Sequence, residues 1–406
     1  MEMTKNPSVI YIGDFDLRNE NVQSFLVKNN AKILRSLGYT VAFVGINTSV
    51  TSFDGLKSLE KLEMEEGFSY LELPNTLNVS GVFKTRRIST SIKSYFDEIA
   101  SSYIVKYLIS YQCPSYSILL KWVIQWCKRH SVKYIVNCAD LPIFDNQPFL
   151  RRVVMAVNWS YLHRINKKNA DGVISVSKYI QDFYKSENRK SVIIPPLFDC
   201  NEYVPSFSKR DDKPVFVYAG IPFKTTGNAV KEKGMKDRLD MIIDLFLKLS
   251  AQSVPYVFKI IGIEQTDYCI GVPRHAGALN SCKDIEFLGR LNHETTLITI
   301  ADADFTINYR DENRMTQAGF STKIVESISV GTPVVINEIS DIFDYIERGS
   351  IGFQLDKEQQ NNIRLLAELC GFSKEKRKAI KQYCVESKLF HVEKYTATVK
   401  GFLEAL

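Results

Sequence analysis

The sequence contains no long uninterrupted run of apolar residues. A membrane-spanning helix needs roughly 18 of them, and the best candidate, residues 116–127, is broken by Lys121 and Gln125. The first eight residues also lack the apolar core that follows the basic start of a signal peptide. We therefore expect neither a transmembrane span nor an export signal.

Motifs for metal and disulfide chemistry are also missing. The eight cysteines lie far apart without a Cys-x-x-Cys, and none of the five histidines stands at the spacing of a metal site. We expect reduced, mostly buried cysteines and no bound metal. Together with the missing export signal, this cysteine usage indicates the cytoplasm.

Neither half of the chain contains internal repeats or low-complexity segments. Its 406 residues are enough for two domains, which commonly share a cleft. With 45% hydrophobic and 24% charged residues, its composition is that of an ordinary globular protein.

Short β-rich runs alternate with helical patterns along the first half. Strands are predicted at residues 8–13, 39–45, 133–137, 172–176 and 191–196, and an amphipathic helix over 22–37. This alternation is typical of a parallel sheet covered by helices. We predict a Rossmann-like acceptor-binding domain over residues 1–205, with the polar segment 200–213 as linker.

A second series of the same kind follows. Strands are predicted at residues 214–220, 256–262, 285–289, 304–307 and 332–336. We predict a second doubly wound domain over residues 206–385. Residues 386–406, with Phe390, Tyr395 and Phe402 among their apolar residues, are predicted to form a helix that packs back on the N-terminal domain.

Charge is divided unevenly between the halves. Residues 1–200 hold 25 Lys and Arg against 18 Asp and Glu, whereas residues 201–406 hold 27 against 28. The basic residues of the first half cluster at 84–87, 128–129, 151–152 and 164–168. Such clusters suit an anionic membrane surface or a phosphate-bearing acceptor, and equally a solvated surface without a ligand. No nucleic-acid recognition motif accompanies them, so nucleic acid is not expected as a partner.

Cations stand at the start of a predicted helix in the second half. After the strand that ends at Gly220, a loop carries several lysines, and Lys236 and Arg238 then open the helix. Positive side chains oppose the dipole of a helix N-terminus, so their presence there requires a reason. A diphosphate bound between Lys236, Arg238 and the free N–H groups of the helix would supply one.

A denser pattern covers residues 310–336, where a polar loop, a turn at Gly319, a helix and a strand follow one another. Lys323 and Glu326 lie three residues apart and therefore share one face of the helix near its start. Lys323 and free amides suit phosphate there, and Glu326 suits ribose hydroxyls. Taken alone, the two residues equally suit a surface ion pair.

Residues 319–326, Gly-Phe-Ser-Thr-Lys-Ile-Val-Glu, followed by Gly-Thr-Pro-Val-Val from Gly331, resemble the donor-binding signature of family 4 glycosyltransferases. Residues 218–220, 234–240 and 287–291 support this resemblance in the family's order and spacing. It covers most of residues 190–350. The resemblance implies an α/β GT-B fold, in which two doubly wound Rossmann-like domains face a central cleft.

The resemblance also implies roles for individual residues. By it, Lys236 binds the diphosphate, Glu326 binds the ribose, and the backbone at Leu291 meets the base. The implied donor site comprises Gly13, Gly220, Arg238, Arg290, Leu291, Arg314, Gly319, Phe320, Ser321, Thr322, Lys323 and Glu326.

Ala318 departs from the family's pattern. It stands at the place of the first Glu in Glu-x7-Glu, whose side chain binds the sugar, and an alanine side chain has no group for that contact. The candidates to replace it are Gln317, Arg314 and Arg310. The two arginines are equally candidates for ion pairs with Asp311 or Glu312.

The first half matches the family less closely. Asn137 and Asp140 end a strand at the expected cleft. Asp140 is a candidate for orienting an acceptor hydroxyl, and with Lys236 and Glu326 it completes the predicted catalytic set. Its alternative role is that of a helix N-cap.

The implied reaction is transfer of a hexosyl or N-acetylhexosaminyl group from a nucleotide-diphosphate donor to a glycan or lipid-linked acceptor, with retention and without a metal or other cofactor. A UDP-sugar is the favoured donor, and polysaccharide or glycoconjugate synthesis the favoured pathway. We expect a cytoplasmic protein whose basic N-terminal domain contacts the inner face of the membrane. Two alternatives stay open, a sugar-nucleotide epimerase of the same fold and a non-catalytic partner subunit.

Overall fold

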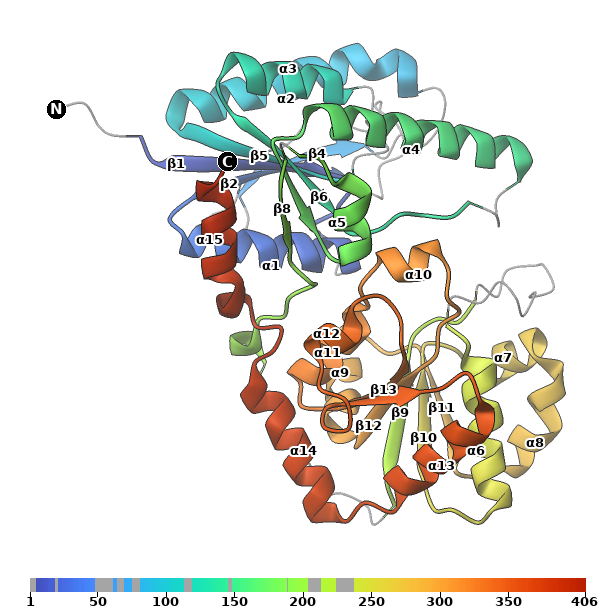
Figure 1. Ribbon diagram of the computed structural model, residues 1–406. Coiled ribbons are helices and arrows are strands. Elements are labelled where there is room, and N and C mark those ends of the chain that lie inside the picture. Colours follow the sequence, from blue (N-terminus) through green and yellow to red (C-terminus); the bar gives the residue numbers. More distant parts are fainter. Residues whose placement is uncertain are drawn as a thin grey trace. The chain divides into compact units, whose positions relative to one another are not determined.

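The computed structural model describes residues 5–18, 21–47, 61–63, 69–74, 81–112, 119–144, 148–187, 189–203, 213–223 and 237–406. The chain divides into two compact units. Unit 1 comprises Met1–Leu197 and Val392–Leu406, and unit 2 comprises Phe198–His391. Each unit contains one β-sheet with helices on both faces (Figure 1).

The sheet of unit 1 has the strand order β3-β4-β2-β1-β5-β6-β7-β8. Its strands are β1 (Pro7–Gly13), β2 (Thr40–Asn47), β3 (Lys61–Glu63), β4 (Ser69–Pro74), β5 (Ile104–Tyr111), β6 (Lys133–Cys138), β7 (Gly172–Ser175) and β8 (Lys190–Ile193). All neighbours pair in parallel except β3 and β4. The order reverses between β1 and β5, so the sheet is doubly wound.

In the described part of unit 1, five helices connect these strands, and one more closes the unit. They are α1 (Val22–Ser36), α2 (Gly81–Ser102), α3 (Leu120–Arg129), α4 (Phe149–Asn169), α5 (Lys178–Tyr184) and α15 (Thr396–Glu404). In Figure 1, α2 and α3 cover one face of the sheet, and α1 and α15 cover the other. The buried β-branched and aromatic residues of β1, β2 and β5 lie between these layers.

Unit 2 contains a six-stranded parallel sheet with the order β11-β10-β9-β12-β13-β14. Its strands are β9 (Val215–Ala219), β10 (Val257–Ile261), β11 (Ile285–Gly289), β12 (Phe305–Asn308), β13 (Val334–Asn337) and β14 (Gly352–Leu355). The helices are α6 (Leu239–Ala251), α7 (Gln265–Gly271), α8 (Ala276–Ser281), α9 (His293–Asp302), α10 (Arg314–Ala318), α11 (Thr322–Ser329), α12 (Ile342–Tyr345), α13 (Gln359–Cys370) and α14 (Lys374–Ser387).

Stacked aromatic rings fill the centre of unit 2. Phe246 of α6 stacks on Phe258 of β10 with 4.2 Å between ring centroids, and Phe216 of β9 stacks on Phe305 of β12 at 5.1 Å. These rings are fully buried. They fix α6 and the two central strands relative to one another.

The α/β class with two doubly wound, Rossmann-like units is confirmed. Four strands escape the sequence patterns: β3 and β4 at one edge of the first sheet, the central strand β5, and β14. β5 begins two residues after α2 ends, so the helical pattern runs into it, and β14 has only four residues. Short runs of this kind carry little periodicity.

The first crossing between the units lies at Leu197 and Phe198, upstream of the predicted boundary at residue 205. The carbonyl of Leu197 accepts a hydrogen bond of 2.6 Å from the Asn29 amide of unit 1. The backbone N–H of Phe198 donates to the carbonyl of Phe390 in unit 2, at 2.9 Å. The hydrogen bonds of these two consecutive residues therefore place Leu197 in unit 1 and Phe198 in unit 2.

The prediction of one helix over residues 386–406 is wrong in its first part. α14 ends at Ser387, and Lys388 adopts a left-handed conformation with φ of 42°, which turns the chain out of the helix. A 3₁₀ turn, Val392–Tyr395, then leads into α15.

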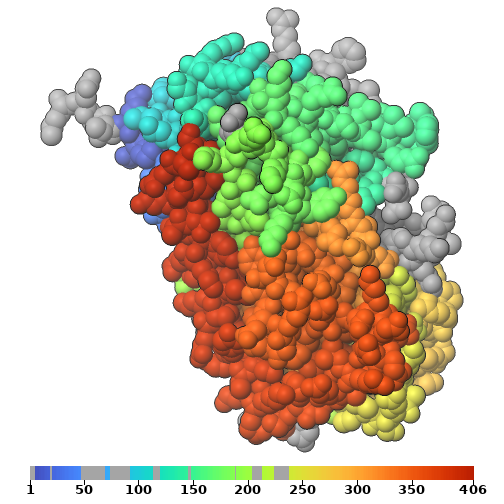
Figure 2. Space-filling view, in the orientation of Figure 1, coloured from blue at the N-terminus to red at the C-terminus, as the bar shows by residue number. Residues whose placement is uncertain are grey.

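α15 packs on unit 1. Val399, Phe402 and Leu403 are buried, and the Tyr107 hydroxyl of β5 donates a 2.9 Å hydrogen bond to the carbonyl of Leu403. In Figure 2 this red segment lies against the blue and green elements of unit 1. The last residues of the chain therefore complete the domain that its first residues begin.

No helix in the part of the chain that the structure describes has the length and apolar character needed to cross a membrane.

Candidate functional site

The strand order of unit 2 reverses between β9 and β12, and this is where doubly wound sheets bind ligands. β9 leads into Gly220, β12 ends at Asn308, and α11 begins near both. A Cβ atom at Gly220 would collide with the Nζ of Lys323, in the first turn of α11. Glycine at this position therefore lets the Lys323 side chain cross the end of β9.

Asp237 is the centre of a polar cluster at this edge. Its carboxylate forms ion pairs with the Nε of Arg310, at 2.8 Å, and with the Nζ of Lys323. The Tyr218 hydroxyl donates to the same carboxylate at 3.2 Å. Asp237 is 1% exposed and Arg310 is 7% exposed, so the Asp237–Arg310 pair is buried.

The cluster joins three elements that lie far apart in sequence. Tyr218 comes from β9, Arg310 follows β12, and Lys323 belongs to α11. The ends of β12 and β13 are tied together, because the Asn337 side chain accepts from the Arg310 N–H at 2.9 Å and donates to its carbonyl at 2.8 Å. Arg310 is thereby held in place by its backbone as well as by its ion pair.

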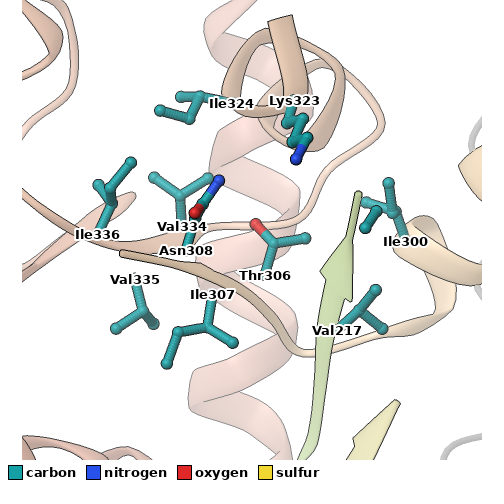
Figure 3. Close-up of a pocket in the computed structure, with 11 residues that line it drawn as sticks. Val217, Ile300, Thr306, Ile307, Asn308, Lys323, Ile324, Val334, Val335 and Ile336 are labelled. Carbon is teal, nitrogen blue, oxygen red and sulfur yellow. The ribbon is translucent and has the colours of Figure 1, made fainter. Parts of the chain in front are cut away.

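A small cavity of about 20 Å³, large enough for a water molecule, lies beside Lys323. Figure 3 shows the side chains of Asn308 and Thr306 turned toward it, among aliphatic residues of β12, β13 and α11. Both polar atoms of the buried Asn308 amide lack a hydrogen-bond partner among the described residues. Since buried amides are nearly always satisfied, this amide has room for one bound water or a ligand atom.

The start of α11 has the character of an anion site. Ser321 is its N-cap residue, but the Ser321 hydroxyl makes no capping bond and, within the described chain, has no partner although it is buried. Free N–H groups and the helix dipole favour negative charge at such an end. Lys323 and Arg310 add two positive charges, and Asp237 offsets one of them.

Glu326 lies one turn further along α11 and pairs with a histidine rather than with Lys323. Its Oε1 is 3.2 Å from the Nε2 of His293, the first residue of α9. This contact brings α11 next to the segment after β11, where Arg290 and Leu291 lie. The surface ion pair between Lys323 and Glu326, the alternative from the sequence, does not form.

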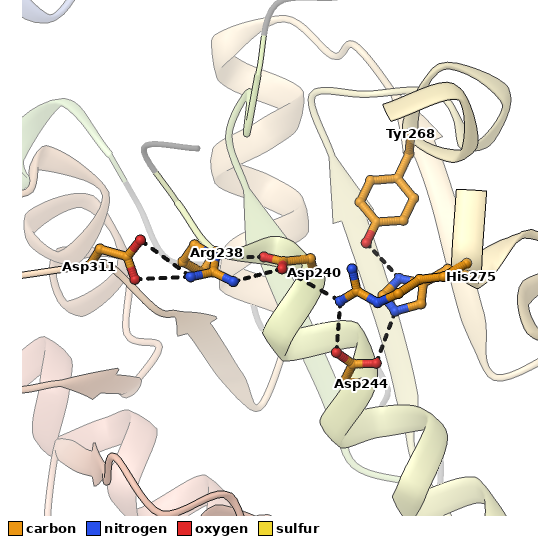
Figure 4. Close-up of polar contacts among 7 residues, drawn as sticks. Arg238, Asp240, Asp244, Tyr268, His275 and Asp311 are labelled. Carbon is orange, nitrogen blue, oxygen red and sulfur yellow. Dashed lines mark hydrogen bonds and ion pairs between the residues drawn. The ribbon is translucent and has the colours of Figure 1, made fainter. Parts of the chain in front are cut away.

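Arg238 is engaged by two carboxylates. It makes two hydrogen bonds of 2.9 Å to Asp240 and a contact of 3.1 Å with Asp311. The hydrogen bonds to Asp240 raise the pKa of Arg238, which stays charged. Arg274 extends these contacts, because it lies 3.5 Å from Asp240 and 2.9 Å from Asp244. Figure 4 shows Arg238 between Asp240 and Asp311, and Asp244 beside His275.

The last contacts of this side-chain network, around Asp244, anchor α6. Asp244 lies 2.9 Å from the Nε2 of His275, whose Nδ1 meets the Tyr268 hydroxyl at 2.8 Å. Burial opposes ionisation of Asp244, but the hydrogen bonds from His275 and Arg274 hold its pKa below the ordinary value. The network fixes the start of α6, and with it the adjacent Asp237.

The remaining donor-site candidates of unit 2 differ in accessibility. Phe320 is buried, and its ring packs edge-on against Tyr345 and Phe390 at 5.5 and 5.8 Å, so the side chain belongs to the core. Arg290 and Arg314 are exposed, whereas Leu291, Gly319 and Thr322 are half-buried. At the turn, the backbone of residues 319–322, the Ser321 hydroxyl and the half-buried Thr322 side chain are therefore left to contact a ligand.

Ala318 is fully buried at the end of α10. Among its predicted substitutes, the Gln317 side chain donates to Glu312 and accepts from the Ser340 N–H after β13. Arg310 pairs with Asp237, not with Asp311 or Glu312. The partner of Asp311 is Arg238.

Two of the candidates lie in unit 1. A Cβ atom at Gly13 would collide with the carbonyl of Tyr111, so glycine is required for the close pairing of β1 with β5. Asp140 follows β6, and its carbonyl accepts a 2.9 Å hydrogen bond from Gln112. It is not the N-cap of α4, because that position is Pro148. Asn137 is buried and accepts from the Tyr11 hydroxyl at 3.0 Å, so it serves the sheet.

Asp14 and Asp16 form an Asp-x-Asp pair directly after β1, which the sequence-based prediction of no bound metal overlooked. Asp16 is buried, and its carboxylate accepts from the Arg18 N–H at 3.1 Å. Within the described ranges, no three His, Cys, Asp or Glu side chains gather as metal ligands do.

Three residues of the site have no place in the sequence analysis: Asp237, His293 and Asn308. Asp237 carried a usable signal, because it is a carboxylate next to Lys236 and Arg238 at a helix start. Lys236 itself lies outside the described residues, so its predicted diphosphate contact stays a prediction.

No protein-family model matches the sequence, and a search of the curated proteins finds no match. Solved structures do match it. Sucrose-phosphate synthase of Thermosynechococcus elongatus matches with a TM-score of 0.64 at 14% identity, over 99% of both chains. HepE of Anabaena, in complex with UDP and glucose, gives 0.64 at 14% identity, over 98% of this chain and 100% of that one.

An Escherichia coli protein described as trehalose-6-phosphate bound with UDP-2-fluoro glucose gives a TM-score of 0.65 at 8% identity, over 98% of this chain and 99% of that one. These similar structures have the GT-B architecture. The chain has the GT-B fold. Identities this low show the fold alone, and they leave membership of family 4 a prediction.

Proposed function

We propose that the chain is a glycosyltransferase that takes a hexosyl or N-acetylhexosaminyl group from a nucleotide-diphosphate donor bound by unit 2. The observation that carries the proposal is the convergence of Lys323, Arg310 and the uncapped start of α11 at the point where the sheet order reverses. These groups suit two linked phosphates. Glu326, held by His293, is suited to a ribose one turn away.

The chemistry of transfer fits such a site. The bond between the anomeric carbon and the diphosphate oxygen breaks, the acceptor oxygen bonds to that carbon, and the acceptor hydroxyl gives its proton to the departing diphosphate. The sugar passes through an oxocarbenium-like state while negative charge grows on the departing diphosphate. Fixed cations and N–H groups aimed at that charge lower the barrier. Lys236 belongs to this group by family resemblance.

The finer parts of the proposal rest on resemblance. A UDP-sugar is the proposed donor, because similar structures carry UDP, glucose or UDP-2-fluoro glucose. We further propose retention at the anomeric carbon, independence from metal, and a glycan or lipid-linked acceptor in polysaccharide or glycoconjugate synthesis. The protein would act in the cytoplasm, with unit 1 and Asp140 on the acceptor side and the basic surface of unit 1 against the inner face of the membrane.

A binding experiment tests the donor site. The purified chain is titrated by calorimetry with UDP-, GDP-, ADP- and dTDP-sugars and the free nucleoside diphosphates. At least one should bind, and Lys323→Met and Glu326→Gln should each weaken it about tenfold or more, since a charge-assisted hydrogen bond contributes about 1.5–3 kcal/mol. Lys248→Ala, an exposed lysine at the other end of α6, is the matched control and should bind like the wild type.

A transfer experiment then separates the proposal from its alternatives. Release of nucleoside diphosphate should depend on an added glycan or lipid-linked acceptor and should be lost in Lys323→Met. Isomerisation of the donor without an acceptor would instead identify an epimerase. Donor binding without transfer or hydrolysis, across a full acceptor panel, would identify a non-catalytic subunit. Failure of every nucleotide to bind would overturn the proposal itself.

A further inference from the structure

Exposed apolar side chains gather on the first half of α4 in unit 1. The large ones are Phe149, Leu150, Val153, Val154 and Val157. Phe149 is 68% and Leu150 is 78% exposed. In the rest of the described chain, exposed large apolar residues occur singly along the sequence, apart from Ile143 just before α4.

Helical spacing places these residues on one face. Positions 150, 153, 154 and 157 stand at i, i+3, i+4 and i+7, and Phe149 lies four residues before Val153. Residues this far apart are neighbours on a helix surface. They form a continuous apolar stripe, which we call the α4 stripe.

The two halves of α4 differ in how they are held. Leu162, His163, Ile165 and Asn166 of the second half are buried, and Asn166 accepts a 2.8 Å hydrogen bond from the Tyr134 hydroxyl. No residue of the first half, 149–160, is buried. In Figure 1 the end of α4 that begins at Phe149 projects past the other labelled elements of unit 1. An apolar surface of this size on an anchored helix marks an interaction site.

The charges on α4 have one sign. The helix carries Arg151, Arg152, Arg164, Lys167 and Lys168 and no acidic residue. Arg151 and Arg152 stand at helix positions on the two sides of the stripe, while Arg164, Lys167 and Lys168 continue the exposed face toward the helix end.

The neighbouring helix α3 adds to the same charge. The ammonium of Lys121 lies 5.6 Å from the centre of the Tyr161 ring, and Lys128 donates to Asn169 at 3.2 Å. Both partners belong to α4. The surface around the stripe is therefore complementary to an anionic partner that also has an apolar interior.

We propose that the α4 stripe docks unit 1 on an anionic phospholipid membrane, with the apolar side chains in the acyl region and the arginines and lysines at the headgroups. Interfacial helices combine these two kinds of residue, and anionic leaflets attract basic segments. A second copy of the chain fits less well, because a symmetric contact places the same basic surface against itself. The inference specifies the membrane contact proposed above and does not depend on sugar transfer.

Vesicle flotation of the full chain tests this inference. The protein should float with phosphatidylserine-containing vesicles at low salt and much less with pure phosphatidylcholine or at high salt. Phe149→Ser/Leu150→Ser and Arg151→Gln/Arg152→Gln should each lower the fraction bound about tenfold. The control Ile270→Ser removes an apolar side chain of unit 2 that is also 78% exposed, and it should bind like the wild type.

Three results would overturn the inference: no binding to the anionic vesicles, binding that neither double variant weakens, or a wild-type dimer that Phe149→Ser/Leu150→Ser dissociates in sedimentation. The last would assign the stripe to a second copy. Circular dichroism shows whether the variants are folded, which is expected because the substituted side chains are exposed. Donor binding by unit 2 should be the same in all variants. A negative result in this test would therefore leave the proposed donor site untouched, and a failure of the donor site would leave this inference untouched.

Discussion

At the scale of single residues, Asp237 is the group on which the candidate site depends. It is a buried carboxylate with two cationic partners, and removing one member of a buried ion pair leaves the other charged and desolvated. Lys323 is half-buried and can exchange Asp237 for a phosphate, whereas the buried Arg310 keeps its partner. Asp237 thus holds both cations in place at the candidate site.

We expect Asp237→Ala and Arg310→Met each to destabilise unit 2 by about 3–5 kcal/mol, because each leaves an unpaired buried charge. The double variant should be destabilised by clearly less than the sum of the two, since neither charge is then left alone. Urea unfolding followed by hydrogen exchange of β9 and β12 measures the three values. Simple additivity would mean that the two side chains do not stabilise each other.

The sequence alone finds part of this site, and the reason is geometric. Lys323 and Glu326 are three residues apart, so helical spacing predicts that they share a face. Asp237, just before α6, contacts Lys323 from 86 residues away, and His293 of α9 contacts Glu326 from 33 residues away. Such contacts depend on how the strands are ordered in the sheet. Spacing within one segment contains no information about that order.

At the scale of elements, α15 illustrates how a short segment can complete a distant domain. Phe402 and Leu403 are buried in unit 1, and a Cβ atom at Gly172 would lie 2.7 Å from the Phe402 ring. Glycine at the start of β7 therefore makes room for that ring. The apolar face of this segment is visible in the sequence, but the break at Lys388 is not, because it depends on a left-handed residue that is not glycine.

We expect Phe402→Ala to destabilise unit 1 by about 3–5 kcal/mol, the usual cost of truncating a buried phenylalanine. The same helix supplies the control, Lys400→Ala, whose side chain is exposed and should change stability by less than about 0.5 kcal/mol. Hydrogen exchange of α1 and β8, which α15 contacts, should rise only in Phe402→Ala. Equal exchange in both variants would show that α15 contributes little to the unit.

The outline of the fold was predictable because both halves alternate strand and helix with clear periodicity. The strands β3, β4, β5 and β14 were not, because their hydrophobic pattern is either very short or continuous with a helix. Assignment of β5 requires its two neighbours, β1 and β6, which pair with it from positions about 97 and 26 residues away. Patterns within one segment therefore do not suffice to assign β5, although its residues are compatible with a strand.

At the scale of the whole molecule, the chain passes between the units twice, at residues 197–198 and 391–392. All three tryptophans, at positions 122, 126 and 159, belong to unit 1. Tryptophan fluorescence therefore reports the unfolding of unit 1, and hydrogen exchange resolves that of unit 2. The two signals allow a ligand to be assigned to a unit without a structure of the complex.

The described groups of the proposed donor site belong to unit 2, so a bound nucleoside diphosphate should stabilise unit 2 first. At 100 times its dissociation constant, a ligand adds about 2.7 kcal/mol to the unit that binds it. For a unit of this size, that gain raises the melting temperature by about 5–10 °C. We expect this shift in the exchange-detected melting of β9, β12 and α11, with a smaller shift in tryptophan fluorescence. A shift confined to fluorescence would place the nucleotide on unit 1, where Gly13 lies, and would remove Lys323 and Glu326 from the site.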